Sequence, residues 1–364
     1  MNPLRLVADD LTGALDAAAP FSSPERPIPV FTAGCLPAVL PVSYAVDLAT
    51  RELDRGAASA VAARHAGLLR PSSGAIAFRK LDSLLRGSGG HELAATLCAI
   101  GPARCLIAPA FPFHGRTTCG GRQWVLGEGF GRPTGEDLRA SLGAKGVPVR
   151  LVRAGDEIPP GVSLWDAATD DDLRRIANLG RRLPGPLLWC GSAGLAGALA
   201  PGSPAARLSI ERPLLGVFGS DDPATAAQLA ACAEHVLPMG LEDEASGAAV
   251  ARRLAHAGLC LASFGVSQGT SRAGAAVHIA RGIEGLAGRI ERPRSLVVAG
   301  GETLRSVFRS AGGERLEVFG QFAPGVPLSR LRGGPWDGTV VVSKSGAFGG
   351  PRLLRQIAGL DQAP

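Results

Sequence analysis

Lysine is nearly absent from this chain. Its 364 residues include three lysines and 35 arginines, so arginine supplies almost all of the positive charge. Two of the three lysines, Lys80 and Lys344, open the segments that are densest in polar and glycine residues, 80–87 and 344–350. Lysine carries a compact point charge on a flexible stem, whereas arginine carries a rigid planar fork. The scarcity therefore indicates that Lys80 and Lys344 stand where a point charge is needed.

Aromatic residues are also scarce, at 5%, and there is a single tyrosine. The core must therefore be built mainly from Ala, Leu and Val. The net charge is +6, but the arginines are spread along the chain and form no basic tail. Proteins that bind nucleic acids usually cluster their basic residues and add aromatic residues for base stacking. We therefore expect no nucleic-acid partner and a small anionic molecule instead.

The chain has no Cys-x-x-Cys pair and no long apolar run, and we expect no signal peptide. Its seven cysteines are an odd number, and we expect reduced thiols that are mostly buried. The first apolar run, residues 4–8, leads directly into two aspartates, which does not fit a signal peptide. No stretch is apolar for long enough to span a membrane. The sequence thus predicts a cytoplasmic protein without a membrane partner.

One pattern recurs along the chain: a short apolar run, a turn of Gly, Ser or Asp, and a helix-like segment. Clear cases begin at residues 4, 76, 187, 214 and 296. Such runs are typical of strands in a parallel sheet that helices cover on both faces. Because the chain is too long for one ordinary core, we expect two domains. The prediction is an α/β protein with two doubly wound domains, mostly parallel sheets and a cleft between the domains.

The best boundary between the domains is residues 200–213, which are rich in Pro and Gly and have no periodicity. It gives an N-terminal domain of residues 1–205 and a C-terminal domain of residues 206–364. Two helix starts support the pattern. Asp222 precedes Pro223, as an N-cap precedes a proline at the first helical position. Thr169 precedes three aspartates, which favour the positive end of a helix dipole.

Charged and hydroxyl side chains follow the predicted strands of the first domain. They are Asp9, Asp10 and Asp16 with Thr12, then Asp47 and Arg51, then Lys80, Asp82, Ser83 and Arg86, and finally Arg116. Ligands of open parallel sheets bind beyond the carboxyl ends of the strands. Arginine forks grip carboxylates and aspartates accept hydroxyl protons. Helix caps and salt bridges account for some of these residues, but the set predicts a site for an anionic, hydroxyl-rich molecule.

The turns of the second domain are rich in glycine and hydroxyl groups instead. They are Gly219-Ser220, Gly300-Gly301-Glu302-Thr303 and the segment that begins at Lys344. Bare backbone N–H groups at helix N-termini bind phosphates, and a nearby lysine neutralises charge. The sequence contains no Gly-x-x-x-x-Gly-Lys-[Ser/Thr] and no strand–helix turn with Gly-x-Gly-x-x-Gly. The turns therefore predict phosphate binding of another kind.

Two alternative chemistries leave traces in the sequence. Gly265-Val266-Ser267-Gln268-Gly269 matches the nucleophile turn of esterases, which requires an acid and then a histidine downstream. The only downstream histidine is His278, and no acid lies between it and Ser267, so a hydrolase is disfavoured. The six histidines show no paired spacing, so we expect no metal site made of protein side chains. Any metal would be Mg²⁺ that arrives with phosphates.

As a set, these motifs resemble those of the four-carbon acid sugar kinases. The resemblance includes Ala8-Asp9-Asp10-Leu11-Thr12-Gly13-Ala14, residues 80–88, Ala108-Pro109-Ala110-Phe111-Pro112 and Gly115-Arg116-Thr117-Thr118. In the second half it includes residues 300–303, 324–327 and 344–349, in the same order. It covers nearly the whole chain. Leu84 and Ser88 depart from the family pattern, in which Thr and Asn are usual, and both flank the expected substrate pocket.

The resemblance implies an N-terminal sugar-acid domain, a C-terminal nucleotide domain and phosphorylation of a four-carbon acid by ATP. Threonate, erythronate and 3-oxo-tetronate are the substrates it suggests. The family's nucleotide residues correspond to Ser220, Gly300, Gly301, Glu302, Thr303 and Gly346. On this interpretation Lys344 helps to hold the triphosphate.

The remaining roles follow from the chemistry of the residues. Arg51, Arg86 and Arg116 would hold the acid together with Asp9 and Ser83, and Lys80 would orient the base or stabilise charge. Either Asp10 or Asp82 would accept the proton of the attacking hydroxyl. A non-catalytic binding protein or sensor with the same fold and a serine hydrolase that uses Ser267 remain alternatives. A homo-oligomer is possible in each case.

Overall fold

The computed structural model describes residues 2–126, 131–153, 156–200, 210–219, 222–240, 244–265 and 272–361. The chain divides into two compact units. The first consists of Met1–Ser23 and Ile28–Ser203, and the second of Pro24–Pro27 and Pro204–Pro364. Ser220 and the segment 266–270, which includes Ser267, lie outside the described residues.

The apolar runs of the first unit form one parallel sheet. Its strands, in the order in which they pair, are β2 (Ile28–Thr32), β3 (Tyr44–Asp47), β1 (Leu4–Ala8), β4 (Ile76–Lys80), β11 (Leu188–Gly191), β5 (Arg104–Ala108), β10 (Gly161–Trp165) and β9 (Val149–Val152). All these pairings are parallel. The chain fills one side of β1 with β2 and β3 before it crosses to β4. The strand order therefore reverses at β1, where sheets of this kind bind ligands.

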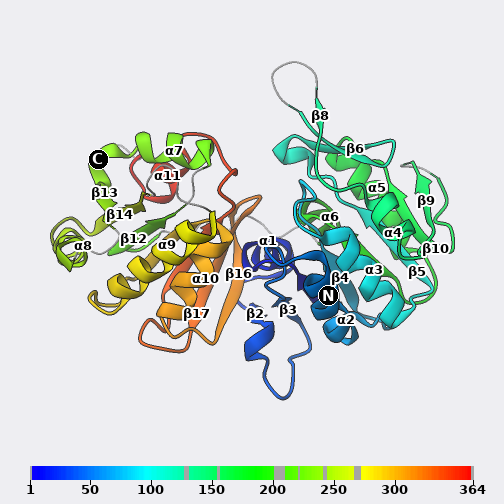
Figure 1. The fold of residues 1–364 in the computed structure, drawn as a ribbon, viewed down its shortest axis with the longest axis horizontal. Coiled ribbons are helices and arrows are strands. Elements are labelled where there is room, and N and C mark those ends of the chain that lie inside the picture. The colour runs from blue at the N-terminus through cyan, green and yellow to red at the C-terminus, as the bar shows by residue number, and fades with distance from the viewer. Residues whose placement is uncertain are drawn as a thin grey trace. The chain divides into compact units, whose positions relative to one another are not determined.

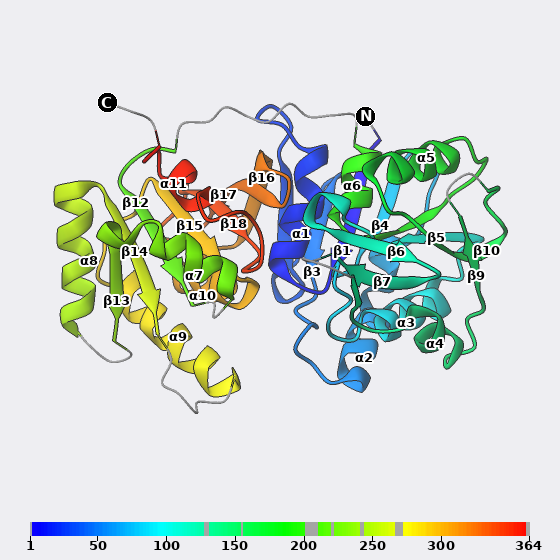
Figure 2. The same cartoon turned by 90° about the horizontal axis from the view of Figure 1, so that it is seen from above.

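Helices cover both faces of this sheet. One face carries α1 (Leu11–Ala18), α5 (Asp170–Arg181) and α6 (Ala193–Leu199), and the other carries α2 (Arg55–His65), α3 (Gly89–Ile100) and α4 (Leu138–Gly143). Figure 2 shows α5 and α6 on one side of the strands and α2, α3 and α4 on the other. A small antiparallel sheet of β6 (Arg116–Cys119), β7 (Arg122–Val125) and β8 (Arg132–Pro133) completes the unit. The first unit is therefore doubly wound.

The second unit repeats the plan with a different edge. Its strand order is β13 (Val236–Met239), β14 (Leu259–Phe264), β12 (Leu214–Phe218), β15 (Ser295–Ala299), β18 (Val340–Lys344), β17 (Val326–Arg332) and β16 (Arg315–Ala323). The pairings are parallel from β13 to β18 and antiparallel from β18 to β16. The order reverses at β12, which lies between β14 and β15. The carboxyl ends of β12 and β15 are thus the expected place for a ligand.

Figure 1 shows the helices of the second unit on either side of its strands. They are α7 (Pro223–Ala230) and α11 (Leu353–Ile357) on one face, with α8 (Glu244–Ala257), α9 (Arg272–Ala287) and α10 (Gly301–Ser310) on the other. Short 3₁₀ turns occur at Ala19–Phe21, Ala33–Cys35, Ala66–Leu69, Pro112–His114 and Ala233–His235. The predicted α/β class with two mostly parallel sheets is confirmed.

The cores consist mainly of Ala, Leu and Val, as the composition predicts. All seven cysteines are free; Cys105, Cys190, Cys232 and Cys260 are buried as expected, whereas Cys35, Cys98 and Cys119 are exposed. Both predicted helix starts are present, because Asp222 accepts from the N–H of Ala224 and Thr169 forms a capping box with Asp172. Among the helices that the structure describes, none is long and apolar enough to cross a membrane.

Candidate functional site

Arg51 joins the carboxylates that follow β1 to the carboxylate that follows β4. Its Nε and Nη2 donate to the two oxygens of Asp9 at 2.8 and 2.7 Å. Its Nη1 lies 2.8 Å from Oδ2 of Asp10, and its Nη2 lies 3.9 Å from Oδ1 of Asp82. The side chain of Arg51 is 15% exposed, and those of the aspartates are less exposed still. One guanidinium therefore balances much of the charge of three buried carboxylates.

Asp82 has a second arginine partner. Nε and Nη2 of Arg86 donate to its two oxygens at 2.7 and 2.9 Å, and the backbone N–H of Arg86 donates at 3.1 Å. Burial raises the pKa of Asp82, but Arg51 and Arg86 outweigh burial and hold this pKa well below its usual range. Burial also raises the pKa of Asp9, but Arg51 outweighs burial and lowers this pKa below its ordinary value. Both carboxylates thus stay ionised at neutral pH and hold protons weakly.

The carboxylate of Asp10 accepts hydrogen bonds from the first turn of α1. Its Oδ1 accepts the N–H of Gly13 at 2.9 Å, and its Oδ2 accepts the hydroxyl of Thr12 at 2.6 Å in addition to Arg51. Lys80 lies close by, since a Cβ built on Gly13 would lie 3.2 Å from Nζ of Lys80. The Lys80 ammonium donates to the carbonyl of Leu81 at 2.8 Å. Asp10 therefore caps α1 close to the Lys80 ammonium.

Asp16, on the next turn of α1, differs from the other aspartates. The residue is 8% exposed, and its carboxyl has no hydrogen-bond or ion-pair partner in the part of the chain that the structure describes. Burial raises the pKa of Asp16 to about 7, although Lys80 and Arg116 act in the opposite direction and Asp10 adds to the rise. The sequence placed Asp16 among the strand-end residues but gave it no role.

A buried ion pair that the sequence did not reveal supports the Arg51 loop. Nη2 of Arg79 donates to Oε2 of Glu92 at 2.7 Å, and the hydroxyl of Thr50 donates to the same oxygen at 2.6 Å. All three side chains are fully buried. The N–H groups of Thr50 and Arg51 in turn donate to the carbonyl of Asp9. Glu92 thus fixes the loop that presents Arg51, and nothing in a helical Glu followed by Leu indicates this role.

The loop that carries Asp82 is held from several sides. Arg116 donates from Nη1 to the hydroxyl of Ser83 at 2.5 Å, and the amide of Gln123 donates to the carbonyl of Ser83 at 2.8 Å. Gly87 has φ +75°, and a Cβ there would lie 3.0 Å from the carbonyl oxygen of Arg51. The two loops therefore touch through a glycine. Of the residues that depart from the family pattern, Leu84 is half-buried and Ser88 is buried before α3.

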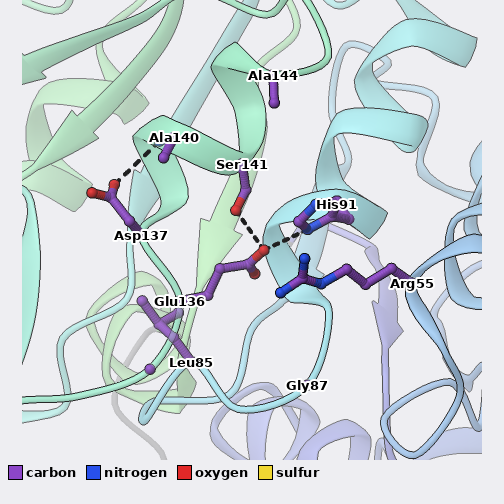
Figure 3. A pocket seen from close by; sticks show the side chains of 10 residues that line it. Arg55, Leu85, Gly87, His91, Glu136, Asp137, Ala140, Ser141 and Ala144 are labelled. Atoms are coloured by element: carbon purple, nitrogen blue, oxygen red, sulfur yellow. Dashed lines mark hydrogen bonds and ion pairs between the residues drawn. The ribbon is translucent and has the colours of Figure 1, made fainter.

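A hollow of about 580 Å³ lies behind this loop and is lined by residues of α2, α3 and α4 together with Leu85 and Gly87 (Figure 3). Glu136 is at its centre. Its carboxylate accepts the N–H of Gly90 at 2.7 Å and the hydroxyl of Ser141 at 2.5 Å, and it pairs with Nδ1 of His91 at 2.5 Å. The Glu136 carboxylate therefore links the residues before α4 to the start of α3 through hydrogen bonds.

In the second unit, two glycine turns meet at the ends of β12 and β15. Helix α10 begins at Gly301 after Gly300, whose φ is +98°, and no side chain of the described residues caps this helix. Its first N–H groups therefore lack intrahelical partners, as at an anion-binding helix start. A Cβ built on Gly219 would lie 3.0 Å from the hydroxyl oxygen of Thr303. Glu302 is exposed and pairs with Arg305 at 2.6 Å.

The third turn of this unit is ordered by α7 and by Lys344. Nζ of Lys344 donates to the hydroxyl of Thr225 at 3.1 Å and to the carbonyls of Ser345 and Gly346 at 3.1 and 3.0 Å. Burial lowers the pKa of Lys344 to about 8, against an opposing effect of Asp222. The N–H of Gly300 donates to the carbonyl of Lys344 at 2.9 Å, which joins this turn to the start of α10.

Four carbonyls of this turn accept hydrogen bonds from two side chains of α7. Thr225 donates to the carbonyl of Gly346 at 2.8 Å, and the amide of Gln228 donates to those of Phe348, Gly349 and Gly350 at 2.9–3.2 Å. In a trans peptide the N–H points away from the preceding carbonyl. The N–H groups of residues 347, 349 and 350 are therefore turned away from α7, in an arrangement suited to an anion. Thr225 and Gln228 are polar residues in the otherwise alanine-rich helix α7, and they were not recognised from the sequence as partners of this turn.

Comparisons with known proteins match the two halves of the chain to two different domain families. Residues 4–144 match the model of a sugar-binding N-terminal domain, and residues 215–354 match that of a nucleotide-binding C-terminal domain. A D-threonate kinase of Cupriavidus necator is 32% identical over 96% of this chain and 95% of its own. The chain belongs to the four-carbon acid sugar kinase family. The resemblance that its motifs predict is confirmed.

Other members of this kinase family are similar over nearly their whole length. A 3-oxo-tetronate kinase of Methylobacterium radiotolerans is 30% identical over 95% of this chain and 96% of its own. A D-threonate kinase of Bordetella bronchiseptica is 29% identical over 97% and 96%. Solved structures of proteins from Salmonella typhimurium LT2 and Haemophilus influenzae share the fold, with TM-scores of 0.76 and 0.67 at 20% and 18% identity. They cover 100% and 98% of this chain and all of their own.

The buried Arg79–Glu92 pair generates a prediction about stability. Replacement of Glu92 by Ala leaves the Arg79 charge buried without a partner, which should cost about 3–5 kcal/mol of unfolding free energy. Urea unfolding followed by circular dichroism measures this loss. Glu157, which is exposed, provides the matched Glu→Ala control, and it should change stability by less than about 0.5 kcal/mol. A loss below about 1 kcal/mol for Glu92→Ala would show that the pair is not structurally important.

The isolated Asp16 generates a prediction with the opposite sign. Its folded pKa of about 7 exceeds the ordinary value of 3.8, so ionisation costs stability as the pH rises from about 4 to 7. Asp16→Asn should therefore raise the melting temperature at pH 8, by an amount that corresponds to about 4 kcal/mol at most. The gain should shrink as the pH falls through 7 and vanish near pH 4. A variant less stable than wild type at pH 8 would contradict this assignment.

Proposed function

We propose that this protein transfers the terminal phosphoryl group of ATP to a hydroxyl of a four-carbon sugar acid, in the cytoplasm and as part of carbohydrate metabolism. Threonate and 3-oxo-tetronate are the first candidates, since they are named in the kinases that resemble this chain over nearly its full length. The observation that carries the proposal is the cluster of Asp9, Asp10, Arg51 and Asp82 at the point where the first sheet reverses its order. The family match adds the nucleotide domain.

The charges of this cluster suit one carboxylate of a substrate. Asp9, Asp10 and Asp82 are balanced by Arg51, Arg86 and Lys80, and Arg116 adds a further positive charge. Asp16, with a pKa of about 7, is only partly ionised at neutral pH. Arg86 is the most accessible of these cations, with a side chain that is 47% exposed. We infer that Arg86, Arg116 and Lys80 contact the acid, with Ser83 beside them. Arg51 acts indirectly, by fixing the positions of Asp9 and Asp10.

The glycine turns of the second unit are assigned to the triphosphate. The uncapped start of α10, with Gly300, Gly301 and Thr303, and the turn that includes Gly346 both offer N–H groups to anions. Lys344 supports this contact through the turn, because its ammonium hydrogens are directed at protein oxygens. Ser220 is assigned to the nucleotide by the family motif alone.

Mg²⁺ fits the donors present near these turns. In proteins this ion is usually held by one or two carboxylates together with phosphates and water. Asp222 and Glu302 are the carboxylates at the starts of α7 and α10. Within the described residues, no group of three or more His, Cys, Asp or Glu could hold a metal ion. When bound, Mg²⁺ would neutralise phosphate charge, and Asp222 and Glu302 are the groups that would hold it.

Phosphoryl transfer requires positioning and charge neutralisation more than covalent chemistry. It also requires that the bound ATP and the bound acid meet, and the expected cleft between the domains stays a prediction. A homo-oligomer and the absence of a nucleic-acid partner also stay predictions. A binding protein without activity has the same requirements for its pockets. Turnover is the property that separates the two functions.

The decisive experiment is a substrate panel. Purified protein is incubated with ATP, Mg²⁺ and D- or L-threonate, D- or L-erythronate or a 3-oxo-tetronate, and ADP release is coupled to NADH oxidation. We expect acid-dependent ADP release with at least one member, together with a phosphorylated acid of matching mass. Hexonates serve as the control for chain length. ATP and acid binding without turnover on the whole panel would favour the sensor.

The assignment of the nucleotide turns makes a separate prediction. Gly301→Leu places a side chain at the first position of α10 and should raise the KM for ATP by about tenfold or more, with the KM for the acid nearly unchanged. Gly288→Leu, at an exposed position of the same unit where a Cβ makes only an ordinary contact, is the matched control. If Gly301→Leu raised the KM for the acid alone, the assigned roles of the two units would be reversed.

A further inference from the structure

We propose that Asp16 is the group that removes the proton from the attacked hydroxyl of the sugar acid. This inference rests on the proposed kinase function and selects a residue within it. In the transfer, the hydroxyl proton passes to the Asp16 carboxylate, and the hydroxyl oxygen forms a bond to the terminal phosphorus of ATP. The bond from that phosphorus to the bridging oxygen breaks, and ADP leaves with the electron pair.

The first argument is the availability of lone pairs. A general base needs an oxygen that can approach the hydroxyl directly. Asp82 is bound by the fork and the backbone of Arg86, and Asp9 by the fork of Arg51. Asp10 accepts from Gly13, Thr12 and Arg51. Asp16 is a buried residue, 8% exposed, and its carboxyl has no such partner among the described residues.

The second argument is direction. Side chains of an α-helix lean toward its N-terminus and cover positions three and four residues earlier. The carboxyl of Asp16 therefore points along the face of Thr12 and Gly13. Gly13 has no side chain to block it, and Nζ of Lys80 lies 3.2 Å from the place of the missing Cβ. Asp16 thus faces the part of α1 that meets the cluster of Arg51, Asp10 and Lys80.

The third argument is proton affinity. Asp9 and Asp82 hold protons too weakly to act as effective bases near neutral pH, since arginines lower the pKa of each. Burial has the opposite effect on Asp16, and it outweighs Lys80 and Arg116. The other charged groups on the strands packed against α1 are Arg5, Asp47 and Arg79, and the last is paired with Glu92. A base works best when its pKa lies near the working pH.

The test is the pH dependence of kcat, measured with saturating ATP, Mg²⁺ and the best acid of the panel from pH 5.5 to 9. Wild-type kcat should rise between about pH 6 and 8, as a base with a pKa near 7 requires. Asp16→Asn should lower kcat by about 10²- to 10⁴-fold, abolish this rise and leave the KM for ATP within about threefold. Asp16→Glu, which keeps a carboxylate, should recover part of the activity with a shifted rise.

Controls separate catalysis from folding. Asp170→Asn, an exposed change of the same kind, should behave as wild type. Thermal melting should show Asp16→Asn folded and at least as stable as wild type at pH 8, because a purely structural role would lower stability and activity together. Asp16→Asn with kcat within tenfold of wild type and an unchanged pH profile would overturn the proposal.

The wild-type profile provides a test that needs no variant. A kcat that is flat from pH 5.5 to 8.5 would also overturn the role of Asp16, whether or not the variant folds. The failure of the function itself looks different, since wild type would then phosphorylate no acid of the panel. In that case the kinase proposal falls and the role of Asp16 falls with it.

Discussion

The first unit depends on the contact of Arg51 with Asp9 and Asp10. Two buried carboxylates on adjacent residues repel each other, and a third, Asp82, arrives from the next strand. Burial of unpaired charges costs several kcal/mol each, so the arrangement requires a cation that reaches all of them. Arginine can do this because its planar fork binds two oxygens on one edge and keeps a third nitrogen for another partner. The loop of Arg51 is fixed for this purpose by Thr50, Glu92 and Arg79.

The two conspicuous lysines turn out to have different surroundings. Lys80 donates one hydrogen bond to a carbonyl, and its charge acts on the carboxylates of Asp9, Asp16 and Asp82. Lys344 is surrounded by neutral oxygens and donates three hydrogen bonds to them. An ammonium in such a place organises carbonyls around itself, which turns the neighbouring N–H groups outward. One lysine therefore supplies charge, and the other supplies backbone geometry.

Much of this could be predicted from the sequence, for identifiable reasons. Strands buried on both faces read as continuous apolar runs, and helix caps such as Thr169 and Asp222 are local signals. Residues after parallel strands converge, so the set around Asp10 and Asp82 could be named. The pairing within the set could not, because it depends on which guanidinium reaches which carboxylate in space. Sequence reasoning therefore could not see that Arg86 occupies Asp82, nor that Glu92 and Gln228 act as supports.

The same limit explains why sequence reasoning assigned Asp16 no role. A sequence shows acids, and not which of them are left without a partner after folding. The fold gives the aspartates of this unit two kinds of environment: Asp9, Asp10 and Asp82 are bound by donors and help to build the site, whereas Asp16 is buried without a donor. A carboxylate that is bound on all sides is a poor base, and one that is buried and unbound is costly to ionise. The energetic cost at Asp16 and its suitability for proton transfer thus have the same main cause, the burial of a carboxyl that no hydrogen-bond donor compensates.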